Sequence, residues 1–157
     1  MTKKKSKLIL WITIISFIMS AVMFGAFVVG LTRPDEDNTD TVGTFGYSLG
    51  TVDESGKVVE SKKSAIQKEM QTVSGMDIQL DEETATVTYK VVFYDENKDY
   101  ISTTESLSAD YDAELTPENA KFFRVIITPY QVDGEDVELS VWNMSKYTKQ
   151  LEVSYNK

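Results

Sequence analysis

The chain has 157 residues, enough for one domain of ordinary size and a membrane anchor, and its formal net charge is −9. The absence of cysteine excludes disulfides, thiolate chemistry and Cys-ligated metals, and the absence of histidine removes the usual general base near neutral pH. The first 33 residues hold five of the 16 basic side chains and no acidic one, so all 25 acidic side chains follow. Because so acidic a domain repels phosphate backbones, we expect no nucleic-acid partner.

Residues 8–31 form 24 consecutive positions without a charged side chain, apolar on all sides. As a helix they would reach about 36 Å, against about 30 Å of hydrocarbon in a bilayer. A lysine cluster at 3–7 precedes the stretch, and an acidic run follows Arg33. The sequence therefore predicts a single-pass transmembrane helix in the cell membrane, with residues 1–7 as a basic cytoplasmic segment and the C-terminal part outside the cell.

A cleaved signal peptide is the competing interpretation of this stretch. The apolar part of a signal peptide is normally about 7–15 residues long and ends at a small-x-small cleavage site. The run in this chain is longer, and residues 28–30 (VVG) fit such a site poorly. We therefore predict an uncleaved signal anchor, with the lipid bilayer as a partner through residues 8–31.

After the helix, residues 32–41 are predicted to be an acidic linker, since Pro34 ends the helix and the following carboxylates repel one another. Residues 42–157 then form the extracellular domain. Turn residues at 53–56, 95–98 and 133–136 separate segments in which apolar and polar residues alternate. Strands are expected in the segments 44–52, 57–59, 76–80, 85–93, 100–101, 122–128, 137–141 and 151–155. Residues 62–75 are compatible with a short helix or an irregular strand.

The alternation of side chains sets the fold class. A two-residue period with β-branched and aromatic residues is typical of strands buried on one face, and it is clearest at 85–93. No helical pattern is long enough for the crossover of a parallel sheet. We therefore predict an all-β fold, an antiparallel β-sandwich or jelly roll, preceded by one N-terminal transmembrane helix.

Two segments, VVFYDENKDYIS at 91–102 and PENAKFFRVIIT at 117–128, carry a family resemblance. Their positions 94–101 and 119–124 resemble framework segments of jelly-roll modules, similar to carbohydrate-binding modules, in surface proteins of Gram-positive bacteria and tail proteins of their phages. The resemblance implies a jelly-roll fold. It leaves sugar binding, spacing and assembly open as functions, since such modules serve all three. No sugar-contacting residue is carried over, because the match covers the framework alone.

Arg124 lies within the second matching segment and alternates with the apolar positions 123, 125 and 127. We expect it on the wetter face of its strand, where it could pair with a carboxylate. Asn119 suits the loop that enters the same strand.

Exposed aromatic rings are the natural platforms for sugars, since a pyranose face packs on a ring and its hydroxyls need polar neighbours. Trp142 is the best candidate because it is out of phase with the apolar positions of the predicted strand 137–141. The speculative ligand-binding residues are Trp142, Asn143, Tyr147, Tyr100 and Tyr130. The alternative for Trp142 is that it covers the end of the sandwich or packs under the final loop.

Metal binding and catalysis have weaker support. Asp95, Asn97 and Asp99 have the spacing of a calcium loop, but Tyr100 stands where an EF-hand needs glycine, and a hairpin turn explains the same residues. We predict no metal site and no cofactor, with a structural calcium at the acidic loops 110–112 or 133–136 as the alternative. No catalytic set or nucleotide-binding motif occurs, so we predict that the chain is not an enzyme.

These observations predict a membrane-anchored extracellular β-sandwich that binds glycan or a cell-envelope polymer without catalysis. The alternative is a structural or interaction subunit whose domain contacts another membrane or envelope protein. That alternative predicts a contiguous apolar patch around Trp142 and Tyr147. The oligomeric state and the identity of the ligand stay open.

Overall fold

The computed structural model describes residues 39–41, 46–81, 83, 85–131 and 133–156, which belong to a compact unit, Asn38–Lys157. The predicted cytoplasmic segment 1–7, the predicted transmembrane helix 8–31 and most of the predicted linker lie outside these ranges. No helix in the described ranges has the length and apolar character needed to cross a membrane.

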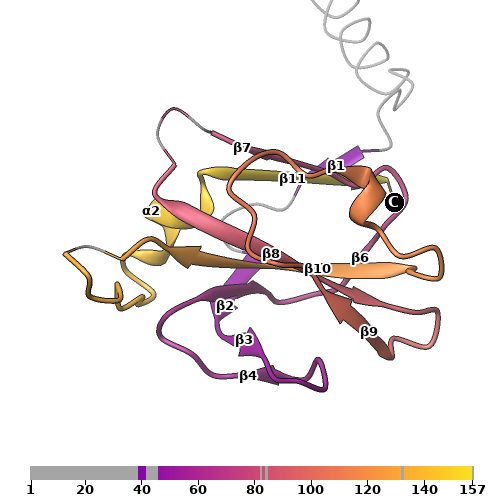
Figure 1. Cartoon of the computed structure of the whole chain (residues 1–157), viewed down its shortest axis with the longest axis horizontal. Coiled ribbons are helices and arrows are strands. Elements are labelled where there is room, and N and C mark those ends of the chain that lie inside the picture. The colour runs from indigo at the N-terminus through magenta and orange to yellow at the C-terminus, as the bar shows by residue number, and fades with distance from the viewer. Residues whose placement is uncertain (1–38, 42–45, 82, 84, 132, 157) are drawn as a thin grey trace, which may run out of the picture. The chain divides into compact units, whose positions relative to one another are not determined.

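The described part of the chain is built mainly from antiparallel strands, which confirms the predicted all-β sandwich (Figure 1). The larger sheet contains six strands, in the order β2 (Tyr47–Leu49), β5 (Ala65–Gln67), β10 (Phe122–Pro129), β8 (Val87–Tyr94) and β9 (Tyr100–Thr103), with β6 (Gln71–Thr72) also pairing with β10. The second sheet has the order β1 (Thr39–Thr41), β11 (Leu151–Asn156) and β7 (Asp77–Leu80). A two-stranded hairpin, β3 (Thr51–Val52) and β4 (Val58–Val59), completes the strands. The short helices are a 3-10 turn, η2 (Ala113–Leu115), and α2 (Met144–Thr148).

The main core lies between the two larger sheets. Alternate residues of β8 and β10, Tyr89, Phe93 and Phe123 among them, are fully buried there. The second sheet contributes Val153 of β11 and Ile78 of β7 to the same core. The two-residue period of these strands therefore places one apolar face of each sheet against the other.

A second, smaller cluster covers the opposite face of the six-stranded sheet. It contains buried Ile66, Val92, Tyr94 and Ile126, with Val52 of the β3–β4 hairpin packed against it. Figure 1 shows this hairpin on the far side of the six-stranded sheet from β1, β11 and β7. Both faces of the central strands β8 and β10 are thus covered near β9, which explains why β8 ends in four consecutive buried residues.

The structure corrects several expected boundaries. The predicted strand 137–141 is absent: this segment is irregular, and the short helix α2 follows it. The strand expected over 44–52 is divided at Gly50 into β2 and β3, and the ambiguous region 62–75 contains the short strands β5 and β6. β1 lies inside the segment assigned to the linker and pairs with β11 near the C-terminus.

Candidate functional site

Trp142 lies in the segment between β10 and α2, where its side chain is 92% exposed, and the neighbouring Val141 is 70% exposed. By contrast, aromatic rings of the main core such as Tyr89 and Phe93 are fully buried. The alternative in which Trp142 covers the sandwich end is therefore wrong. The strand phase used to predict its exposure was also wrong, since no strand forms at 137–141.

Local hydrogen bonds hold this segment in place. The backbone N–H of Ser140 donates to Oδ1 of Asn143 at 2.7 Å, and Nδ2 of Asn143 donates to the carbonyl of Glu138 at 3.0 Å. The N–H of Met144 donates to the carbonyl of Ser140 at 3.0 Å. The Asn143 amide thus has a structural role, closing the turn from which Trp142 projects, and this turn fixes the backbone of the exposed ring.

A hollow of about 550 Å³ lies beside the segment that contains Trp142, although Trp142 itself is not among its lining residues. Its lining includes Val141 and Met144 from the Trp142 segment, Leu49 from β2, and the polar side chains of Ser48 and Ser145. We call the side chains of 141, 142, 144 and 145 the Trp142 surface. This surface offers one large ring, apolar neighbours and hydroxyl groups within a single short segment.

The remaining sequence-predicted residues are dispersed. Tyr147 is half-buried and packs against the main core, with the Lys146 ammonium 5.4 Å from the centre of its ring. Tyr130 is 41% exposed directly after β10. Tyr100 packs against the second cluster, on the other face of the six-stranded sheet. The structure therefore brings Trp142, Asn143 and Tyr147 into one segment and separates Tyr100 from them.

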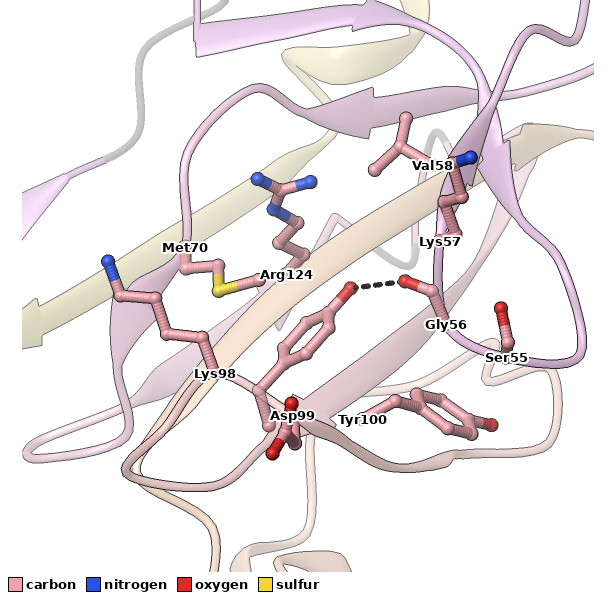
Figure 2. A pocket seen from close by; sticks show the side chains of 10 residues that line it. Ser55, Gly56, Lys57, Val58, Met70, Lys98, Asp99, Tyr100 and Arg124 are labelled. Carbon is pink, nitrogen blue, oxygen red and sulfur yellow. Dashed lines mark hydrogen bonds between the residues drawn. The ribbon is translucent and has the colours of Figure 1, made fainter.

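A second hollow, of about 300 Å³, lies at Tyr100. Arg124, which the sequence did not predict to be a site residue, also lines it. We call this hollow the arginine pocket. Its lining includes Lys57, Tyr94, Lys98, Asp99, Tyr100 and Arg124 (Figure 2). These residues come from the β3–β4 turn, from β8, from the turn between β8 and β9, from β9 and from β10, so segments distant in sequence form the pocket.

Arg124 points away from the main core, as the alternation of β10 predicted, but the expected carboxylate partner is not found. Arg124 is half-buried, its Nε is enclosed, and this atom has no hydrogen-bond partner. Among the described residues an ion pair joins Lys63 and Asp136, and none involves Arg124. The alternation of apolar and polar residues in β10 predicted on which face of the sheet Arg124 lies. It could not predict that the β3–β4 turn lines a pocket on this face.

Two tyrosines form an aromatic wall of the arginine pocket. Tyr94 donates a hydrogen bond to the carbonyl of Gly56 at 3.2 Å, and its ring meets that of Tyr100 edge-on, with centroids 6.5 Å apart. Burial raises the pKa of the Tyr94 hydroxyl, an effect that the nearby Arg124 charge opposes. The hydroxyl therefore stays protonated near neutral pH, where it acts as the donor to Gly56.

The acidic loops considered for calcium use their carboxylates in local structure. Asp95 accepts hydrogen bonds from the N–H groups of Asn97 and Asp99, and Asp110 accepts one from the N–H of Leu80 at 2.8 Å. Asp112 caps η2. Across the described ranges, no group of three or more acidic side chains is arranged to hold a metal ion.

Together, the fold and these two hollows define a class: an all-β sandwich domain with an exposed aromatic surface and a separate, positively lined pocket. No family model, curated protein or solved structure matches this chain.

Proposed function

We propose that the chain is a membrane-anchored, extracellular, non-catalytic binding module whose ligand is a glycan or another cell-envelope polymer. The observation that carries this proposal is Trp142, a large ring that is 92% exposed on a turn closed by the Asn143 amide. An indole left in water forgoes the burial that stabilises other rings, and a backbone held in place by hydrogen bonds needs little further ordering when a ligand stacks on the ring.

The neighbourhood of Trp142 supports a sugar as the ligand. A pyranose has one apolar face for the ring, and the hydroxyl groups of Ser48 and Ser145 line the adjoining hollow. The jelly-roll resemblance of residues 91–102 and 117–128 agrees with this proposal, as does the predicted anchor at 8–31, which would hold the domain at the envelope.

The test is binding of the full-length protein, purified in a non-ionic detergent, to purified envelope polysaccharide and to a glycan array. Trp142→Ala should lower the affinity about tenfold, because an aromatic contact contributes about 0.5–1.5 kcal/mol beyond the area that it buries. The melting temperature should not change, because the side chain packs against little of the domain. Leu115→Ala is the matched control, since Leu115 is an exposed apolar residue on η2.

Fluorescence gives a direct second readout. The chain has two tryptophans, Trp11 and Trp142, so in a Trp11→Phe variant the emission reports on Trp142 alone. Stacking of a sugar should shift this emission to shorter wavelength. If no polysaccharide binds, and a protein partner co-purifies with wild type but not with Trp142→Ala, the module is an interaction subunit and the glycan proposal is wrong.

A further inference from the structure

The arginine pocket contains a cation that the described fold does not neutralise. Arg124 sits in the middle of β10, between Phe123 and Val125 of the main core, so its side chain emerges on the opposite face. The β3–β4 turn lines the hollow on this face, and Nε of Arg124 is enclosed and has no hydrogen-bond partner. Because Nε is enclosed, an anion from solution would meet the outer nitrogens of the guanidinium. A partly buried guanidinium without a counter-charge is costly unless an acceptor approaches it.

The charges around Arg124 reinforce its effect. Lys57 and Lys98 line the same hollow as Arg124, together with one acidic residue, Asp99. In the view of Figure 2, Lys98 and Lys57 stand on opposite sides of Arg124. After residue 33 the chain has 11 basic and 25 acidic side chains, so three cations in one pocket run against the charge of the domain as a whole. A local positive potential of this kind attracts anions to one place on a surface that otherwise repels them.

Local contacts restrain the walls of the pocket, which favours binding of a small group. Gly56 lies against Tyr100 so closely that an added Cβ would stand 2.2 Å from the Tyr100 ring. Its carbonyl accepts the hydrogen bond from Tyr94. Lys98 has a left-handed backbone, with φ of 67°, in a turn closed by two hydrogen bonds to Asp95. A lysine in this conformation is strained, and such strain concentrates at ligand sites.

We propose that the arginine pocket binds an oxyanion, a phosphate or carboxylate group carried by an extracellular polymer. The guanidinium of Arg124 can donate two parallel hydrogen bonds to such a group, and Lys57 and Lys98 add charge at the rim. A volume of about 300 Å³ suits a small charged unit of a chain rather than a long segment. This site is separate from the Trp142 surface and does not depend on the proposed glycan site.

The experiment follows the Nε–H signal of Arg124 by nuclear magnetic resonance in the full-length protein in a non-ionic detergent. Arg33 and Arg124 are the two arginines of the sequence, so an Arg124→Lys variant assigns the signal. Inorganic phosphate, glycerol phosphate, glucuronate and neutral glucose are titrated separately. We expect a saturable shift with phosphate ligands or with glucuronate, and the tighter of these identifies the oxyanion. Added sodium chloride should weaken the binding.

Variants separate charge from folding. Binding of the variants is measured by isothermal titration calorimetry, because Arg124→Gln lacks the arginine signal. Arg124→Gln should weaken binding more than tenfold, and Lys57→Gln several-fold; Lys57 is exposed, so its loss leaves the fold intact. Lys149→Gln removes the same charge from an exposed site outside the pocket and should leave the affinity unchanged. Lys98→Asn should weaken anion binding with little change in melting temperature. Asparagine tolerates the left-handed backbone better, which offsets the lost contact of the Lys98 ammonium with the Phe122 ring, 5.5 Å from its centre.

The proposal is overturned if neither phosphate nor glucuronate shifts the Arg124 signal, or if glucose shifts it equally. It is also overturned if Lys57→Gln and Lys149→Gln bind the anion with the same affinity as wild type. Binding of glycan at the Trp142 surface with no anion effect would overturn this inference and leave the proposed function standing.

Discussion

Gly56 and Gly134 both have left-handed backbones but differ in their surroundings. Comparing them tests the contact between Gly56 and Tyr100 in the arginine pocket. Gly56 has φ of 76° and faces the Tyr100 ring, whereas Gly134 has φ of 81° and nothing within 4 Å of a built Cβ. Alanine at either position incurs roughly 1–2 kcal/mol of left-handed backbone strain. Gly56→Ala must in addition displace Tyr100, so it should lower the unfolding free energy more than Gly134→Ala. Urea unfolding of both variants measures the difference, and equal losses would contradict the proposed closure of the turn on Tyr100.

Gln67 is a polar residue buried in the middle of the six-stranded sheet. Its Oε1 accepts a hydrogen bond from the N–H of Val125 at 2.9 Å. Gln67→Leu removes this acceptor and leaves the N–H of Val125 unpaired, a loss of about 1–3 kcal/mol. It also removes Nε2 of Gln67, a buried donor without a partner, so the net loss of stability should lie at the lower end of that range. Gln79→Leu, at an exposed position on β7, should change stability by less than about 0.5 kcal/mol. Urea denaturation distinguishes the two, and similar losses for both variants would show that the Gln67 bond does not matter.

At the scale of elements, long strands were predictable and short segments were not. β8 and β10 each extend over eight residues, long enough for the two-residue period to show both the strand and its buried face. Residues 137–141 have the same alternation but no strand partner. The N–H of Leu139 instead donates to the carbonyl of Lys62, and Asn143 binds the adjoining backbone. Such local side-chain bonds compete with a sheet ladder, and alternation alone does not reveal them.

The candidate sites were predictable to the same limited degree. Sequence reasoning selected Trp142, which is exposed, but by a strand phase that does not exist. It placed Arg124 on the correct face of β10 because that face follows from period two. It could not foresee the arginine pocket, because Lys57 reaches Arg124 through a hairpin that is far away in sequence. Contacts between distant segments leave no local pattern.

The ion pair of Lys63 and Asp136 joins the segment before β5 to the loop after β10, and it gives the domain a pH dependence. The hydrogen bond from Lys63 holds the pKa of the Asp136 carboxyl below its ordinary value of 3.8. A carboxyl with a lowered pKa stabilises the fold fully above its ordinary pKa, and this contribution disappears as the pH falls through the folded value. Asp136→Asn should therefore be less stable than wild type near neutral pH, and the two should converge in acid.

The same contact sets the upper limit of this pH range. The hydrogen bond to Asp136 raises the pKa of Lys63 above 10.5, so its contribution persists at neutral pH and is lost as the pH rises through the raised value. Unfolding curves for wild type and Asp136→Asn, recorded from acid to alkaline pH, should show a plateau in their difference. Glu152→Gln, at an exposed position on β11, serves as the control and should show no such plateau. A difference that persists unchanged into strong acid would contradict the assignment to Asp136.

At the scale of the whole molecule, the division of charge agrees with a domain that works outside a membrane. The acidic residues begin after Arg33, and the basic cluster lies at the other end of the apolar stretch. An acidic surface keeps the domain away from anionic lipid and polymer in general. In our proposal the arginine pocket is the place where an anionic group binds, so the proposed selectivity arises from the contrast between the charge of the pocket and that of the rest of the surface.

The predicted anchor gives the last test, because its insertion energy can be altered by known amounts. Residues 8–31 contain 14 leucine, isoleucine, phenylalanine and valine residues. At about −0.3 to −0.6 kcal/mol each, these favour insertion by roughly 4–8 kcal/mol. Two lysines near the centre, Ile18→Lys with Met19→Lys, would oppose insertion by roughly 5–7 kcal/mol. Wild type should therefore sediment with membranes and lose its C-terminal domain to protease added to intact cells, whereas the double variant should resist that protease. Ile18→Leu with Met19→Leu is the matched control and should behave as wild type. A wild-type chain that stays soluble after gentle lysis would show that residues 8–31 do not anchor it.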